Sequence, residues 1–116
     1  VAGGEARWFL HLTEDPPENF CRPSVDVLFR SAAKTWGGRA LGVILTGMGQ
    51  DGALGCEALR GAGGAILAQD PSSSLIWGMP GAVVRAGWAN EVVPLDRMAN
   101  RLQTWATSAP GESRGL

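Results

Sequence analysis

The feature that most constrains the fold is an uninterrupted apolar run, Leu41-Gly-Val-Ile-Leu-Thr46, that leads directly into a glycine-rich turn. A strand with one face in water alternates apolar and polar residues, whereas a strand covered on both faces reads as a continuous apolar run. The run therefore predicts a strand buried on both faces of a mostly parallel sheet. Residues 65–69 have the same character and predict a second strand of that sheet.

Strand-like and helix-like segments alternate along the rest of the chain. Strands are predicted over residues 6–13, 41–46, 65–69 and 88–93, and helices over residues 25–36, 51–62, from 78 onward, and 95–106. Ser24 is a favourable N-cap for the helix over 25–36, with Asp26 in its first turn. The alternation predicts an α/β fold with right-handed crossovers. About four strands are few for such a sheet, so the chain is interpreted as a section of a larger domain.

Composition excludes several classes of function. Ten Lys+Arg against eleven Asp+Glu give a net charge of -1, which provides no basic surface for nucleic acid. The longest apolar stretch, residues 41–45, is far too short to cross a bilayer, so no membrane insertion is expected, and no signal peptide is visible. Cys21 and Cys56 are far apart and lack metal-ligand spacing. Free thiols in a cytoplasmic protein are therefore expected.

The turn Gly47-Met-Gly-Gln-Asp-Gly52 permits three interpretations. As G-x-G-x-x-G between a strand and a helix, with Asp70 near the position of a ribose-binding carboxylate, it is compatible with a dinucleotide-binding module. Asp51 opposes this interpretation, because its carboxylate would occupy the amide donors that a pyrophosphate needs. In a second interpretation Asp51 only caps the following helix. In a third, Asp51 is an ionised carboxylate at the C-terminal end of a buried strand and orients a catalytic histidine.

A family resemblance favours the third interpretation. Leu45-Thr-Gly-Met-Gly-Gln-Asp-Gly52 closely resembles the L-T-G-M-G-x-D-G segment of chemotaxis protein-glutamate methylesterases, the CheB family. Further matches in the family's order and spacing are Arg22-Pro-Ser-Val-Asp-Val-Leu-Phe29, Ala68-Gln-Asp70, Gly78-Met-Pro80 and Glu91-Val-Val-Pro-Leu95. The resemblance implies that residues 1–106 are the C-terminal part of the family's catalytic domain, a parallel-sheet three-layer αβα fold. Residues 107–116 are expected to form a flexible tail.

The resemblance also implies an activity and two site residues. Family members hydrolyse methyl esters of glutamate side chains on methyl-accepting chemotaxis receptors with a Ser-His-Asp triad, and they can also deamidate receptor glutamines. By this resemblance Asp51 is the triad aspartate, and Met48 supplies a backbone N–H to the oxyanion hole. No metal or organic cofactor is implied. Many members carry an N-terminal receiver domain, which is a candidate partner in the parent protein.

The chain departs from the family's pattern at the other two triad positions. It contains no Gly-x-Ser-Thr-Gly-Gly turn, in which the family's nucleophile lies, and its only histidine, His11, belongs to a different strand from the family's catalytic histidine. We therefore expect the serine and the histidine to lie outside this chain, and the chain alone to be inactive. Two alternatives remain open: a non-catalytic, partner-binding fragment, and a dinucleotide-binding module that uses Gly47–Gly52.

Overall fold

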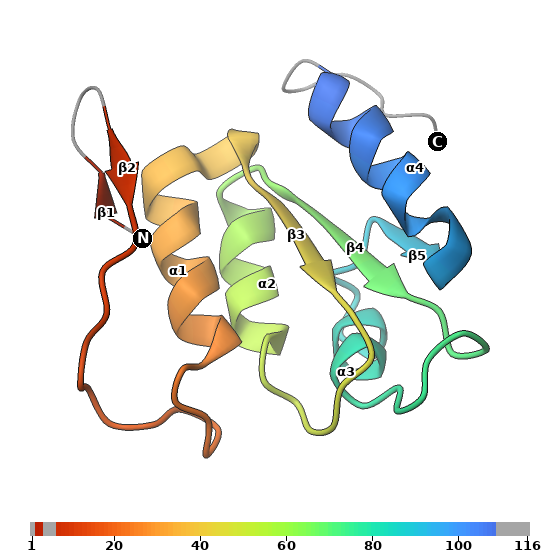
Figure 1. Cartoon of the computed structure of the whole chain (residues 1–116), viewed down its shortest axis with the longest axis horizontal. Coiled ribbons are helices and arrows are strands. Elements are labelled where there is room, and N and C mark those ends of the chain that lie inside the picture. Colours follow the sequence, from red (N-terminus) through yellow and green to blue (C-terminus); the bar gives the residue numbers. More distant parts are fainter. Residues whose placement is uncertain (1, 4–6, 109–116) are drawn as a thin grey trace.

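The computed structural model describes residues 2–3 and 7–108, and it shows an α/β fold (Figure 1). In chain order the elements are β1 (Ala2–Gly3), β2 (Trp8–Phe9), α1 (Val25–Trp36), the short 3₁₀ helix η1 (Gly37–Arg39), β3 (Leu41–Ile44), α2 (Ala53–Gly61), β4 (Ala65–Gln69), α3 (Met79–Arg85), β5 (Glu91–Val93) and α4 (Leu95–Thr107). Helix α4 ends one residue beyond its predicted end. Residues 109–116 of the predicted tail lie outside the described residues.

The central sheet contains β3, β4 and β5 in that order, and all three strands are parallel. Leu41 pairs with Ala65 across the first ladder, and the second ladder begins where Leu67 pairs with Glu91. Asn90 lengthens the second ladder, because its amide N–H donates to the carbonyl of Ile66 while its side-chain oxygen accepts from the N–H of Ile66, both at 2.8 Å. The predicted parallel sheet is confirmed. The strands predicted over residues 41–46 and 88–93 are both shorter than predicted, because β3 ends at Ile44 and β5 begins at Glu91.

Helices cover both faces of this sheet. Side chains of β3 and β4 on one face, such as Ile44 and Ile66, belong to a buried cluster with residues of α1, α2 and α3. On the other face Leu67 packs with Met98 and Trp105 of α4. Figure 1 shows α1 and α2 side by side and α4 apart from them. The predicted three-layer αβα arrangement is confirmed, and the complete burial of β4 explains why its sequence shows no alternation.

Helix α4 is fixed to β5 by a partly buried ion pair. Glu91 accepts hydrogen bonds of 2.8 and 2.6 Å from the Arg101 guanidinium, which binds both carboxylate oxygens. The indole N–H of Trp105 donates to the same carboxylate. A two-pronged guanidinium–carboxylate pair sets an orientation as well as a contact. Glu91 therefore orients α4 over the second face of the sheet.

The prediction of one strand over residues 6–13 is wrong. Trp8–Phe9 pairs antiparallel with Ala2–Gly3, in a two-stranded sheet separate from the central one. Trp8 packs on Trp36 of α1, with ring centroids 5.3 Å apart. Leu10 and Leu12 follow without regular structure and are 77% and 91% exposed. Beyond Trp8, the alternating apolar pattern thus has no core beneath it, and Ala6 lies outside the described residues.

Helices α1 and α2 cross closely because Gly55 lies where they meet. A Cβ atom on Gly55 would lie 2.7 Å from the Cβ of Phe29 and 3.1 Å from the Cα of Asp26. These distances are shorter than van der Waals contact, so only glycine permits this approach. Gly55 and Asp26 both belong to the first turns of their helices. The crossing therefore brings the two helix N-termini together.

We predict that Gly55→Ala lowers the free energy of unfolding by about 1–3 kcal/mol, because the added methyl group must push the two helices apart. Gly61→Ala is the matched control on the same helix, since a Cβ atom there meets nothing within 4 Å. The control should leave stability unchanged or raise it by up to about 1 kcal/mol through helix propensity. Urea denaturation measures both. Equal stability of Gly55→Ala and the wild type would contradict the close crossing.

Candidate active site

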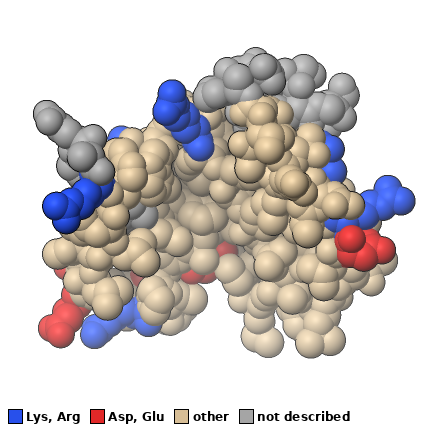
Figure 2. All heavy atoms as spheres, turned by 45° about the horizontal axis from the view of Figure 1, so that its top comes forward, with Lys and Arg blue, Asp and Glu red and all other residues tan. Residues whose placement is uncertain are grey.

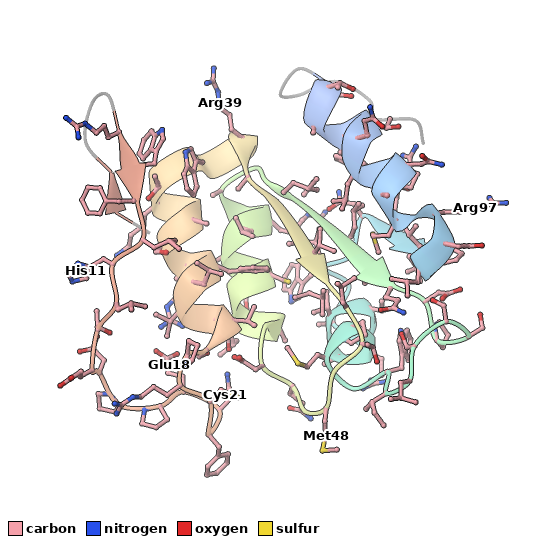
Figure 3. All side chains as sticks on the ribbon, viewed as in Figure 1. His11, Glu18, Cys21, Arg39, Met48 and Arg97 are labelled. Atoms are coloured by element: carbon pink, nitrogen blue, oxygen red, sulfur yellow. The ribbon has the colours of Figure 1, made fainter. Side chains whose placement is uncertain are left out.

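Both predicted site residues lie in the loop that joins β3 to α2. This loop leaves the C-terminal end of β3, which is where parallel α/β sheets place their ligand sites. The Asp51 residue is only 5% exposed, whereas Met48 is 81% exposed. Figure 3 shows Met48 at the tip of the loop, at the same end of the molecule as Glu18 and Cys21. The loop therefore holds a buried carboxylate beside an exposed turn.

Asp51 caps helix α1, not the helix that follows it. Its Oδ2 atom accepts a 2.7 Å hydrogen bond from the N–H of Val25. Its Oδ1 atom accepts from the Ser24 hydroxyl at 2.7 Å and from the N–H of Asp26 at 3.3 Å. The interpretation of Asp51 as the N-cap of α2 is wrong, because the N-cap of α2 is Gly52, with φ 109° and no side-chain bond. The predicted N-cap role of Ser24 is confirmed.

Helix α2 is capped in return by a carboxylate from α1. The Oδ1 atom of Asp26 accepts from the N–H of Gly52 at 3.0 Å and from the N–H of Gly55 at 2.7 Å. Each helix N-terminus thus binds an acidic side chain from the other segment, which the two helix dipoles favour. The side-chain amide of Asn19 joins the pair, because Nδ2 donates to Asp26 at 2.7 Å and to Asp51 at 2.9 Å.

These donors keep the Asp51 carboxylate ionised. Burial raises the pKa of Asp51, but hydrogen bonds together outweigh burial and hold its pKa below the ordinary value; in decreasing order they come from Ser24, Val25, Asn19 and Asp26. Oδ1 accepts three of the bonds, whereas Oδ2 accepts one from the described residues. A carboxylate oxygen has about two acceptor sites. Asp51 is therefore an ionised, fixed carboxylate whose Oδ2 retains acceptor capacity.

The N-terminus of α2 is a poor phosphate site. The amides of Gly52 and Gly55, which a pyrophosphate would need, already bind the buried carboxylate of Asp26. The sequence correctly indicated that a carboxylate occupies these donors, but it assigned that role to Asp51. A dinucleotide would have to displace the Asp26 carboxylate, which argues against a dinucleotide-binding module.

The backbone just before Met48 is hydrogen-bonded to the segment that leads into α3. The N–H of Gly47 donates to the carbonyl of Ile76 at 2.9 Å, and the carbonyl of Gly47 accepts from the N–H of Gly78 at 3.1 Å. A Cβ atom on Gly78 would lie 2.8 Å from the Gly47 oxygen and 2.9 Å from the Gly49 nitrogen. Within the described residues the Met48 N–H has no hydrogen-bond partner. A backbone donor without a partner among the described residues therefore lies in the same loop as Asp51, directly after the hydrogen-bonded Gly47.

A buried amide supports the base of this loop. Gln69, the last residue of β4, is 1% exposed. Its Oε1 atom accepts from the N–H of Thr46 at 2.8 Å, and its Nε2 atom donates to the carbonyl of Ser73 at 2.8 Å. The Thr46 hydroxyl in turn exchanges hydrogen bonds with the backbone of Ile76. Sequence reasoning missed this role, although a glutamine that ends an otherwise apolar strand was a usable signal.

Other polar candidates lie apart or are occupied. His11 is exposed, and Figure 3 shows it pointing away from the loop that carries Met48. Asp70 accepts hydrogen bonds from Ser72 and Ser73 within its own turn. Burial raises the pKa of the Cys56 thiol to about 12, so this thiol is unreactive. No cluster of three or more His, Cys, Asp or Glu that could hold a metal ion occurs in residues 2–3 and 7–108.

The surface gives no sign of a nucleic-acid interface on the face that Figure 2 shows. Lys and Arg side chains are scattered there rather than gathered in a patch.

Both cysteines are free thiols, as predicted. Among the described residues, no helix combines the length and the apolar character that crossing a membrane requires.

We predict that Ser24→Ala destabilises the fold by about 0.5–2 kcal/mol, because it removes both the cap of α1 and a donor to Asp51. Hydrogen bonding lowers the pKa of Asp51, so this stabilisation is present above about pH 4 and is lost as the pH falls through the folded-state pKa. The difference in unfolding free energy between Ser24→Ala and the wild type should therefore narrow below about pH 4. The deficit should not vanish, because the Ser24 hydroxyl also caps α1 by accepting from the N–H of Asp26, a group that does not titrate.

The measurement is urea denaturation of the wild type and Ser24→Ala between pH 3 and pH 7. Ser24→Thr is the matched control, since it retains the hydroxyl and should stay near the wild type. A deficit that is the same at every pH would contradict the coupling between Ser24 and an ionised Asp51.

Comparison with known proteins shows the family of the chain. The family model described as CheB methylesterase matches residues 2–102. A protein-glutamate methylesterase/protein-glutamine glutaminase of Trichodesmium erythraeum is 57% identical over 93 residues, which are 80% of this chain and 26% of that protein. A second such protein, from Caulobacter vibrioides, is 52% identical over 85% of this chain and 28% of its own length. The chain therefore spans about a quarter of the length of these curated relatives.

A solved structure shows the same fold. The catalytic domain of the Thermotoga maritima CheB methylesterase superimposes with a TM-score of 0.75 at 34% sequence identity, over 77% of this chain and 47% of that domain. The family model covers most of the chain, and the structural likeness extends across the sheet and its helices. The chain belongs to the CheB methylesterase family.

Proposed function

We propose that this chain contributes the triad aspartate and an oxyanion-hole amide to a protein-glutamate methylesterase. The observation that carries the proposal is the Asp51 carboxylate, which is buried, held ionised by hydrogen bonds, and able to accept one more donor at Oδ2. A catalytic histidine needs such a partner to fix its tautomer and to offset its developing charge. Relatives that are 52–57% identical carry the name of this activity.

The substrates in this proposal are methylated glutamates of methyl-accepting chemotaxis receptors, reached in the cytoplasm. A serine Oγ attacks the ester carbonyl while the histidine takes the serine proton. The tetrahedral oxyanion is stabilised by backbone donors, including the Met48 N–H. When the C–O bond breaks, the histidine returns the proton and methanol leaves. Water then cleaves the acyl-enzyme to give glutamate and free serine, and a glutamine side chain follows the same steps with loss of ammonia.

In each step Asp51 stays ionised. Its role is to accept the Nδ1–H of the histidine, which leaves Nε2 free to take the serine proton, and to stabilise the imidazolium that results. Neither a serine in the family's nucleophile turn nor a suitably placed histidine occurs in the chain. We infer that both come from another part of the catalytic domain, since the chain matches 47% of the solved one.

The open edge of β3 supports this inference. Within the described residues β3 pairs only with β4. Two grooves of about 370 and 340 Å³ lie along α1 and β3. Leu28 and Phe29 of α1 line both grooves, and apolar residues of β3 also line each groove. We infer that a further parallel strand of the catalytic domain pairs here, which would bring its C-terminal end beside Asp51.

One part of the proposal rests on the family resemblance alone. A receiver domain in the full-length protein would control access to the site, as in many family members. A non-catalytic, partner-binding fragment is the competing function, because the chain lacks two of the three triad groups. Activity measurements on the full-length protein decide between the enzyme and the binding fragment.

We predict that Asp51→Asn in the full-length protein lowers kcat by about 10²–10⁴-fold, because a neutral amide can favour the wrong histidine tautomer and cannot offset the imidazolium. Stability should also fall by about 1–3 kcal/mol, since the new NH₂ group replaces one of the two acceptor oxygens and cannot accept from donors such as the Val25 N–H. Methanol release from methylated receptor membranes, measured well below the melting temperature, gives kcat.

Asp70→Asn is the matched control for this experiment. Asp70 also follows a strand of the sheet, but it is only partly buried, and within the described residues its side chain accepts hydrogen bonds from Ser72 and Ser73 of its own turn. Its substitution should leave kcat within about twofold of the wild type. A loss of less than tenfold for Asp51→Asn would remove the triad role from Asp51.

We predict that Met48→Pro lowers kcat by about 10²–10³-fold, because proline has no N–H to offer the oxyanion. Met48→Ala is the control: it keeps the N–H and removes only a side chain that is 81% exposed. Its kcat should stay within about threefold of the wild type. Melting temperatures of both proteins check that the loop is intact. Equal activity of the two variants would show that the Met48 N–H takes no part in the reaction.

A further inference from the structure

A short turn before α1 reaches the carboxylates of the candidate site. Glu18 and Cys21 exchange backbone hydrogen bonds of 3.1 and 2.8 Å, which close the turn around Asn19. The carboxylate of Glu18 forms a 2.6 Å ion pair with Arg30, so the turn is fixed to α1. Asn19 has φ 55°, in the left-handed region that asparagine tolerates better than most residues. The turn therefore presents the Asn19 side chain toward the helix N-termini.

The amide of Asn19 contacts both carboxylates at once. Its Nδ2 atom lies 2.7 Å from Oδ2 of Asp26 and 2.9 Å from Oδ1 of Asp51. An amide nitrogen carries two hydrogens, so each carboxylate can receive one. Two negative charges this close repel each other, and a shared donor offsets part of that repulsion. Asn19 thus satisfies two acidic side chains without adding a charge of its own.

The same contact decides which oxygen of Asp51 stays available. Asn19 and the Ser24 hydroxyl both bind Oδ1, which also accepts the longer bond from the N–H of Asp26. Oδ2 binds the N–H of Val25 alone among the described donors. With its donors divided in this way, the carboxylate cannot rotate without breaking hydrogen bonds.

We propose that Asn19 is a positioning residue: it holds Asp26 and Asp51 together and fixes the Asp51 carboxylate so that Oδ2 is left to accept the histidine N–H. The inference rests on the proposed function, because it assumes that Asp51 serves a triad. It also explains the residue type. An aspartate would add a third negative charge, and a lysine would neutralise the carboxylate that must offset the imidazolium. Asn19 is exposed, so the core does not need it.

The test uses Asn19→Gly in the full-length protein, because glycine accepts the positive φ and the change removes only the side chain. We expect kcat to fall about tenfold with KM within about twofold, since the substrate still binds but the histidine is held less well. Arg30→Gln is the matched control. It breaks the ion pair that fixes the same turn without touching Asp51, and kcat should stay within about twofold of the wild type.

The pH profile of the Asn19→Asp variant distinguishes a positioning role of Asn19 from a purely structural role in the turn. The added carboxylate favours the protonated histidine, so the acid limb of the kcat/KM profile should shift upward by about 0.5–1 pH unit. An Asn19→Gly protein whose kcat lies within twofold of the wild type, or equals that of Arg30→Gln, overturns the positioning role. Asp51→Asn measured in parallel separates the two proposals: if it retains activity both fail, and if it is inactive while Asn19→Gly is not, only the positioning role fails.

Discussion

The reciprocal capping of α1 and α2 is the interaction on which the rest of the structure depends. Asp51 binds the N-terminus of α1, and Asp26 binds the N-terminus of α2. Each carboxylate satisfies backbone donors that would otherwise be buried without partners, and each lies at the positive end of a helix dipole. The two sets of hydrogen bonds run in opposite directions between the same two segments. The crossing of the helices and the loop before α2 therefore cannot shift independently of each other. The position of Asp51 is therefore set by the packing of the helix layer.

Glycines make this arrangement sterically possible. Gly55 allows the two helix backbones to approach, and Gly52, with φ 109°, turns the chain so that its N–H faces Asp26 rather than solvent. Gly78 lets the segment before α3 close over the backbone of the Met48 loop. The G-x-G-x-x-G spacing, which in isolation suggests phosphate binding, here serves a tight loop: Gly49 and Gly52 have φ of 99° and 109°, and a Cβ atom on Gly47 would lie 2.7 Å from the sulfur of Met79. The same residue types support either purpose, and the difference lies in whether a carboxylate of the protein already occupies the amides.

What the sequence could predict follows from the range of the interactions involved. The strands β3 and β4, the helix over residues 25–36 and its cap at Ser24 follow from patterns within a few neighbouring residues, and they were predicted correctly. Strand β3 nevertheless ends two residues before its predicted end, and only its Gly42 and Ile44 are buried. The family motif identified Asp51, but the partners of Asp51 are 25 to 32 residues away in the chain, so its neighbour in sequence, α2, was taken for the helix it caps. The prediction for residues 6–13 was wrong for the opposite reason. The local alternation of apolar residues indicated a strand, but no core lies beneath Leu10 and Leu12. Asn19 carries no local signal at all, since its role depends on two carboxylates from separate segments.

In the proposed function Asp51 belongs to a catalytic site that is divided between two parts of one domain, and its geometry bears on how such a division can work. A carboxylate that depended on a distant histidine for its hydrogen bonds would be buried and unsatisfied until that histidine arrived, and its pKa would rise. Asp51 instead receives its donors from Ser24, Val25 and Asn19, all on the segment that enters α1. Its ionised state is therefore established by this part of the fold alone, before any other catalytic group is added. A histidine that then meets Oδ2 encounters a charge and an orientation already in place, which is the preorganisation that makes electrostatic stabilisation effective in a buried site. The arrangement that stabilises two crossing helices and the arrangement that would orient a histidine are thus the same set of hydrogen bonds.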